Sequence, residues 1–224
     1  MLTILDIGCK FGIHPSNLPF IDIANHVLVD ADKEEIEYLQ KHYGSHENIQ
    51  CMNYALTSTK ERRDLKSISI NKYNHPGGDS ILKPDLEQFY WKHLRPGTGE
   101  IHEHEDVNTT TVDELCEKLD ISPRFLKIDI EGYELKALQG AETVLKKSAI
   151  CLRIEVEFNT LYKDHAPSAG PVMEHLRNKG FELMNFEMFG NSFSPYSIYH
   201  NSATYGQLVG CDAIFTRPVD YILQ

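Results

Sequence analysis

Short apolar runs alternate with amphipathic stretches along most of the chain. Residues 2–7 (LTILDI) and 26–30 (HVLVD) are compact apolar runs, a pattern typical of buried strands. Between 33 and 43, apolar side chains recur at helical spacing and Gly44 follows, which predicts a helix that ends there. A third strand is predicted over 49–56.

The same alternation returns after residue 110. Thr111 stands three residues before Glu114 in the spacing of a capping box, which predicts a helix that runs to Leu119. Strands that alternate with helices predict an α/β fold with a mostly parallel sheet and helices on both faces. Ligands bind such sheets beyond the carboxyl ends of the strands. The remaining predicted elements are strands over 125–130, 149–158, 181–189 and 209–216, and helices over 134–147 and 171–179.

The segment 57–106 has the least regular pattern. Residues 66–70 alternate as a half-exposed strand would, and residues 85–94 carry one apolar helical face. Glycine- and proline-rich turns surround both. We interpret the segment as an irregular insertion in a single domain that covers 1–224. A lid over a site and a surface excursion without function both fit this pattern.

Composition narrows the class of protein. The chain has 224 residues, 41% of them hydrophobic and 25% charged, which is typical of a globular domain. A formal net charge of −11 argues against nucleic acid as a partner. Five cysteines without CxxC spacing indicate free thiols in a reducing compartment. No apolar run reaches the length of a membrane span and no signal peptide is evident, so we expect a cytoplasmic protein.

The first predicted strand ends in a glycine-containing turn, residues 6–12 (DIGCKFG). Gly8 and Gly12 allow a sharp turn and close approach of a ligand to the backbone. Their spacing is neither GxGxxG nor that of a P-loop, which disfavours a pyrophosphate ligand. Asp6, beside the turn, suits a ligand with a cationic amino group, such as S-adenosylmethionine. A tight turn without a ligand would give the same pattern.

Two further strand ends carry carboxylates. Asp30 ends the second strand, where a carboxylate can accept hydrogen bonds from both ribose hydroxyls, and Asp32 is expected to cap the following helix. Asp129 and Glu131 leave the strand predicted over 125–130. They are suited to orienting a hydroxyl, acting as a general base or binding a metal. Glu134 is more simply explained by interaction with the helix N-terminus.

Several segments resemble the FkbM family of methyltransferases. Residues 125–145 (FLKIDIEGYELKALQGAETVL) resemble the family's most specific sequence, around its fourth strand. Residues 6–12 resemble its first glycine loop, residues 53–56 its third-strand ending, residues 78–82 its serine-containing loop and residues 212–215 its last strand. The resemblance covers nearly the whole chain. It implies a Rossmann-like methyltransferase fold with a seven-stranded sheet.

The resemblance also implies S-adenosylmethionine as methyl donor and a hydroxyl acceptor on a sugar or natural product. The chain departs from the family at Lys10, where the family often has Asn, and in ending its second strand with Asp-Ala rather than Glu-Pro. Little chain precedes the first strand. The resemblance places Asp6, Gly8 and Gly12 at the methionine end, Asp30 at ribose, Ala55 near adenine and Asp129 at the reaction centre. Cys9, Lys10 and Ala31 are further expected cofactor contacts.

A neutral hydroxyl is a poor nucleophile, so a base or a metal usually assists its methylation. We expect Asp129 or Glu131 to accept or orient the acceptor proton, with Glu155 and Glu157 as further candidates. We assign no residue as a metal ligand and leave open whether a divalent metal takes part. The run 102–106 (HEHED) is interpreted as a solvated loop.

The expected partner is a small-molecule or saccharide acceptor. Tyr196, Tyr199, His200 and Tyr205 are candidates to line its pocket, because aromatic faces suit sugar rings. Two alternative functions stay open. One is a nicotinamide-dependent oxidoreductase, although the third glycine of its motif is missing. The other is a non-catalytic nucleoside-binding module of the same fold. The sequence does not indicate an oligomeric state.

Overall fold

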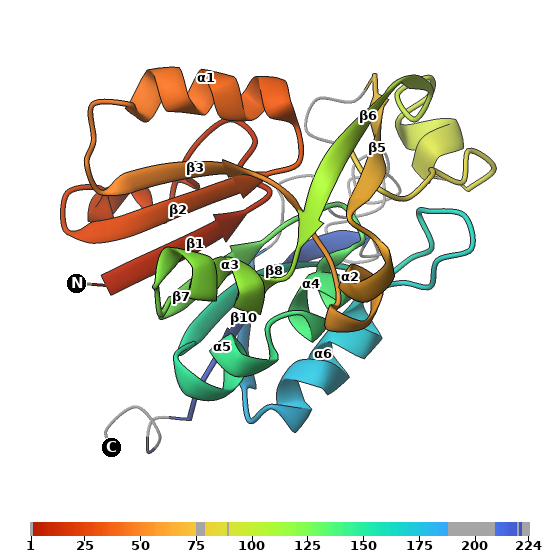
Figure 1. The fold of residues 1–224 in the computed structure, drawn as a ribbon. Helices are drawn as coiled ribbons and strands as arrows, with labels where there is room; N and C mark the ends of the chain where they lie inside the picture. Colours follow the sequence, from red (N-terminus) through yellow and green to blue (C-terminus); the bar gives the residue numbers. More distant parts are fainter. Residues whose placement is uncertain (1, 75–78, 89, 188–208, 219, 221–224) are drawn as a thin grey trace.

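A computed structural model describes residues 2–74, 79–88, 90–187, 209–218 and 220 (Figure 1). Its centre is a seven-stranded sheet in the order β3-β2-β1-β7-β8-β10-β9. Strand β10 runs antiparallel to both of its neighbours, and the other neighbouring pairs are parallel. This confirms the predicted mostly parallel seven-stranded sheet. The strands are β1 (Leu2–Ile7), β2 (Ala24–Asp30), β3 (Ile49–Asn53), β7 (Phe125–Ile128), β8 (Cys151–Glu157), β9 (Glu182–Glu187) and β10 (Gly210–Thr216).

Helices cover both faces of this sheet, because side chains alternate along each strand. On β2, Leu28 packs with Ile36 and Leu39 of α1. Val27 and Val29 join a larger core with residues of α3, α4, α5 and α6. Figure 1 shows α1 along β3, apart from the group of α3 to α6. The helices are α1 (Lys33–Tyr43), α2 (Thr59–Asp64), α3 (Val112–Leu119), α4 (Glu134–Gln139), α5 (Glu142–Lys147) and α6 (Ala169–Asn178), with short helical turns η1 (Leu18–Phe20) and η2 (Tyr90–Leu94).

A second, three-stranded sheet has the order β4-β6-β5 and lies beside the large one (Figure 1). Its strands are β4 (Ala55–Leu56), β5 (Ser67–Tyr73) and β6 (Ile101–Thr110). The interpretation of 102–106 as a solvated loop was therefore wrong. These residues pair with β5, with His104 opposite Asn71, while most of their side chains stay exposed. Backbone pairing without apolar side chains leaves no alternation to recognise in the sequence.

Several predicted elements are shorter than expected. The strand predicted over 49–56 is interrupted at Tyr54, whose N–H donates to the Asp30 carbonyl (3.1 Å). The helix predicted over 134–147 is broken at Gly140, where a Cβ would lie 2.3 Å from the Thr57 carbonyl oxygen. Within the helix predicted over 85–94, the turn η2 (Tyr90–Leu94) has helical geometry.

The predicted helix caps are confirmed. The Asp32 side chain accepts hydrogen bonds from the Glu34 and Glu35 amides, and Thr111 Oγ1 accepts one from the Glu114 amide (3.0 Å). All five cysteines are free thiols. Among the helices described here, none has the length and apolar character needed to cross a membrane.

Candidate active site

A cavity of about 780 Å³ opens at the carboxyl ends of β1, β2 and β7. This volume lies in the usual range for small-molecule sites, about 300–1,000 Å³. The location is the one that the alternation of strands and helices predicts. The predicted site residues that line the cavity are Gly8, Lys10, Gly12, Asp30, Ala31, Ala55, Asp129, Glu131 and Glu155.

The glycine turn is shaped by the neighbouring chain as much as by any ligand. Gly8 has φ +74°, and a Cβ at this position would lie 1.7 Å from the Asp129 carbonyl oxygen. The Gly8 N–H donates to the Val29 carbonyl (2.8 Å), which ties the turn to β2. Gly8 is therefore required for the ends of β1 and β7 to lie side by side. The sequence identified this glycine but not the backbone that it accommodates.

Asp6 and Cys9 were predicted cofactor contacts but do not line the cavity, and each is only 1% exposed. The Asp6 carboxylate accepts a hydrogen bond from the His14 amide (3.3 Å) and lies 3.6 Å from Lys127 Nζ. Burial raises its pKa, and the lysine opposes that shift. Cys9 packs in the apolar cluster beneath α1. Asp6 thus holds the glycine turn in place from behind.

Asp30 presents its carboxylate to the cavity from the end of β2. Its Oδ1 accepts a hydrogen bond from the Asp32 amide (2.9 Å), which fixes the side chain. Burial raises the pKa of Asp30 to about 7. Asn53 Nδ2 donates to the carbonyls of Asp30 and Ala31, at 3.1 and 2.8 Å. These contacts hold a hydrogen-bond acceptor at the expected ribose position.

An apolar wall adjoins Asp30. Ala55 is 3% exposed and packs with Ile70 and Val107, and Ala31 and Ile81 contact the same cluster. Such a surface suits the flat face of a heterocyclic base. The sequence indicated Ala55, whereas Ile70 and Ile81 come from the segment whose structure was least predictable.

Ion pairs cross the mouth of the cavity. Lys10 Nζ lies 2.5 Å from Asp79 Oδ2 and 3.7 Å from Asp32 Oδ2. The pKa of Lys10 is raised: burial lowers it, but the hydrogen bond and charge of Asp79 outweigh that effect. Lys72 Nζ lies 3.2 Å from Asp32 and 2.9 Å from Glu105. Asp79 lines the cavity and was not among the predicted site residues, whereas Lys72 does not line it.

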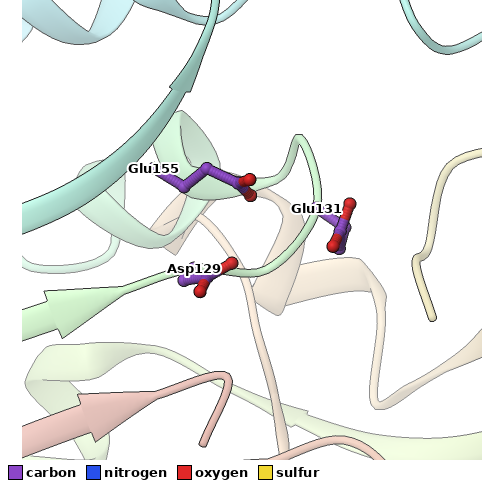
Figure 2. A group of neighbouring side chains, drawn as sticks. All are labelled: Asp129, Glu131 and Glu155. Atoms are coloured by element: carbon purple, nitrogen blue, oxygen red, sulfur yellow. The ribbon is translucent and has the colours of Figure 1, made fainter. Parts of the chain in front are cut away.

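Three carboxylates converge on the deep part of the cavity. Ligand oxygens of Asp129, Glu131 and Glu155 all lie within 4.8 Å of one another, and Figure 2 shows the side chains pointing toward a common space. Asp129 and Glu131 come from the turn between β7 and α4, and Glu155 comes from β8. The prediction that β7 extends to residue 130 was wrong, since it ends at Ile128. The turn nevertheless brings both acids to one place.

The local environment favours the protonated forms of two of these acids. Burial, followed by the charge of Asp129, raises the pKa of Glu131 to about 8. Tyr162 Oη donates a hydrogen bond to Glu131 Oε2 (2.8 Å). The same two causes raise the pKa of Glu155 well above its usual range, and its Oε2 is buried without a hydrogen-bond partner among the described residues.

Lys127 lies beneath the cluster and was missed by the sequence reasoning. Its Nζ is 3.2 Å from Asp129 Oδ2 and 2.5 Å from the Gly8 carbonyl oxygen. Neighbouring negative charges raise its pKa, although burial opposes them. A charged side chain inside the apolar run Leu126–Ile128 was a visible signal, because buried lysines require partners.

The turn that carries the acids is fixed by Glu134, which is completely buried. Its Oε1 accepts hydrogen bonds from the amides of Ile130 (2.9 Å) and Gly132 (3.1 Å). Glu134 therefore binds the turn before α4, rather than only the helix end that was predicted. Glu157, a further candidate base, is 3% exposed and does not line the cavity. The aromatic candidates Tyr196, Tyr199, His200 and Tyr205 lie outside the described residues.

Comparisons with known proteins identify the family of this chain. The model of the methyltransferase FkbM domain family matches residues 8–183. No curated protein matches the sequence. The crystal structure of methyltransferase FkbM from Methylobacillus flagellatus KT is similar, with 14% identity and a TM-score of 0.51 over 95% of this chain. The chain spans 43% of the length of that protein.

A second similar structure is a SAM-dependent methyltransferase from Aquifex aeolicus. It has 10% identity and a TM-score of 0.43, over 96% of this chain and 81% of that one. The likeness to the FkbM structure concerns the fold, whereas the family model covers most of the chain, including every predicted cofactor contact except Asp6. The chain therefore belongs to the FkbM family of methyltransferase domains.

Proposed function

We propose that this chain transfers the methyl group of S-adenosylmethionine to a hydroxyl group on a sugar or natural product. The observation that carries the proposal is the convergence of Gly8, Asp30 and Asp129, from three strand ends, on one cavity. A carboxylate for ribose and acids for an acceptor proton thereby face the same space. The Asp30 carboxylate and the apolar surface around Ala55 also suit a nucleoside without phosphate groups.

The residues present fit such a donor. Asp30 would accept hydrogen bonds from the ribose hydroxyls, and Ala31 and Ala55 would contact the adenine. The turn from Gly8 to Gly12 would border the methionine end. Lys10 is 24% exposed at its side chain and lies at this turn, so it would bind the methionine carboxylate in place of Asp79. Lys127 is 5% exposed and already bound to Asp129 and the Gly8 carbonyl.

When bound, S-adenosylmethionine supplies a methyl group that the positive sulfur has already activated. The protein must then align the acceptor and remove its proton. Asp129 and Glu131 line the cavity, and their carboxylates are suited to accept or orient this proton. Tyr162 Oη holds the Glu131 side chain in position through its 2.8 Å hydrogen bond.

Calorimetry would test the proposal directly. We expect S-adenosylmethionine and S-adenosylhomocysteine to bind one molecule per chain, and NAD to give no binding heat. Replacing Asp30 by Asn should weaken binding of both nucleosides about tenfold, the effect of losing a charged hydrogen-bond acceptor. Tight binding of NAD without binding of S-adenosylhomocysteine would overturn the proposal in favour of an oxidoreductase.

A further inference from the structure

We propose that Asp129, Glu131 and Glu155 bind one divalent cation of the oxygen-preferring class, Mg²⁺ or Mn²⁺, which orients the acceptor hydroxyl. The role of the cation in orienting the acceptor rests on the proposed function, but the cation site itself does not. Ligand oxygens of the three acids lie within 4.8 Å of one another. Oxygens on opposite sides of a Mg²⁺ ion are about 4.2 Å apart, so small side-chain rotations bring all three into coordination distance.

Unpartnered oxygens around the cluster point independently to a missing positive charge. Glu155 Oε2 is buried and has no hydrogen-bond partner among the described residues. Glu134 and Glu157, at 0% and 3% exposure, each also leave a buried Oε2 without a partner. Burying an acceptor without a donor costs free energy, and burying a charge without a partner costs more. A divalent cation would satisfy Glu155 and neutralise the neighbouring acids.

Lys127, the lysine that contacts Asp129, does not neutralise all three acids. Lys127 Nζ lies 3.2 Å from Asp129 Oδ2, and the same amino group binds the Gly8 carbonyl and faces Asp6. Lys127 is thus already shared among Asp129, Asp6 and the Gly8 carbonyl. Glu131 and Glu155 lie across the shared space that Figure 2 shows.

The donor set and the position decide the class of cation. Three carboxylates without histidine or thiolate favour Mg²⁺ or Mn²⁺ over Zn²⁺. All three residues also line the 780 Å³ cavity, so coordination positions on that side remain open to water or acceptor oxygens. An ion there would polarise a bound hydroxyl and lower its pKa.

The run 102–106 provides a matched control, because its carboxylates do not line the cavity that holds the proposed site. Glu103 in this run is exposed on β6. Glu105 is already bound to Lys72, at 2.9 Å. Replacing Glu103 removes one carboxylate from the chain without altering the proposed site.

Titration with Mn²⁺, followed by electron paramagnetic resonance, tests the site on the full chain without any acceptor. We expect one saturable Mn²⁺ per chain, with Mg²⁺ competing. Asp129→Asn and Glu155→Gln should each weaken Mn²⁺ binding about tenfold or more, while Glu103→Gln leaves it unchanged. Thermal unfolding confirms that each variant is folded.

Two results would overturn the proposal: a folded wild-type chain without saturable Mn²⁺ binding, or equal binding by wild type and both cluster variants. Calorimetry with S-adenosylhomocysteine on the same samples separates the two proposals. If the nucleoside binds but Mn²⁺ does not, the cation site is wrong and the donor assignment stands. If Mn²⁺ binds at the cluster and the nucleoside does not, the donor assignment fails instead.

Discussion

The Asp30 carboxylate lies where ionisation is costly, since burial raises its pKa to about 7 from an ordinary value near 4. The folded chain therefore binds this proton more tightly than the unfolded chain does. The resulting stabilisation is complete below about pH 4 and is lost as the pH rises through 7. An ionised Asp30 carboxylate at the expected ribose position thus lowers the stability of the folded chain near neutral pH.

Asp30→Asn should consequently unfold at a higher temperature than wild type at pH 8. We expect a gain of about 2–5 °C there that shrinks toward pH 5, measured by thermal denaturation. Asparagine keeps an oxygen for the Asp32 amide, so the local hydrogen bond survives. Affinity of the wild-type chain for S-adenosylhomocysteine should fall between pH 8 and pH 6, and the variant should lose this dependence. A variant less stable than wild type at pH 8 would contradict this explanation.

Gly8→Ala tests the close approach of two strand ends. The added Cβ would meet the Asp129 carbonyl oxygen at 1.7 Å, so the turns must separate. We expect a loss of about 3 kcal/mol or more in the free energy of unfolding, measured with urea, together with weaker nucleoside binding.

Gly97→Ala is the matched control for this variant. Gly97 has nearly the same backbone angle, φ +76°, but nothing lies within 4 Å of its added Cβ. The free energy of unfolding of this variant should fall by only about 1 kcal/mol, the cost of the added backbone strain. Equal urea midpoints for the two variants would show that the contact with Asp129 does not matter.

The sequence indicated the individual site residues better than the contacts that they make. Asp30, Asp129 and Glu131 follow apolar strand runs, and that position alone was enough to predict that they would lie together. Asp79 and Tyr162 carry no comparable signal, because they reach the site from irregular segments. Contacts between residues far apart in the sequence are set by tertiary packing, which a single sequence does not display.

Among the helices and turns, the short turn between β7 and α4 determines the geometry of the acids. Glu134 Oε1 accepts hydrogen bonds from two backbone amides of this turn. Its Oε2 has no hydrogen-bond partner among the described residues. Burial raises the pKa of Glu134 to about 7, so the charged form is costly above that pH.

Glu134→Ala should therefore lower the free energy of unfolding by about 2–4 kcal/mol, because two buried amides lose their acceptor. Glu134→Gln keeps an oxygen for both amides and removes the charge. Its free energy of unfolding should remain within about 1 kcal/mol of the wild-type value. The difference from wild type should favour the variant more at pH 8.5 than at pH 6. Urea denaturation at both pH values measures this. Equal losses in the two variants would show that the amide hydrogen bonds are not what stabilises the turn.

Element boundaries were the least predictable level of the fold. The helix expected over 134–147 breaks at Gly140 because the Thr57 backbone passes close to it. The strand over 102–106 went unrecognised because it pairs through its backbone while most of its side chains face solvent. By contrast, buried parallel strands such as β1 and β2 are continuous apolar runs, and these were predicted to within a few residues.

Across the whole molecule, Lys72 connects the two sheets. Its amino group, on β5, binds Asp32, the N-cap of α1 just after β2, and Glu105 on β6, and its side chain is 8% exposed. Neighbouring carboxylates raise its pKa although burial lowers it, so it stays charged. These ion pairs thereby tie the three-stranded sheet, which forms part of the cavity wall, to the end of the large sheet.

Lys72→Met should lower the free energy of unfolding by about 3 kcal/mol, because two partly buried carboxylates lose their counter-charge. Lys33→Met is the control, since the pair of Lys33 and Glu37 is exposed (67% and 64%) and should change stability by less than about 0.5 kcal/mol. Chemical denaturation of both variants provides the comparison. If the loss in Lys72→Met is as small as in the control, the ion pairs do not join the sheets energetically.

A crystal structure of the chain with S-adenosylhomocysteine would show whether the cavity binds the methyl donor. We expect both ribose hydroxyls to lie within hydrogen-bond distance of Asp30, and the sulfur to face Asp129 across the cavity. A nucleoside bound at another edge of the sheet, away from Asp30 and Asp129, would show that the assignment of this site is wrong.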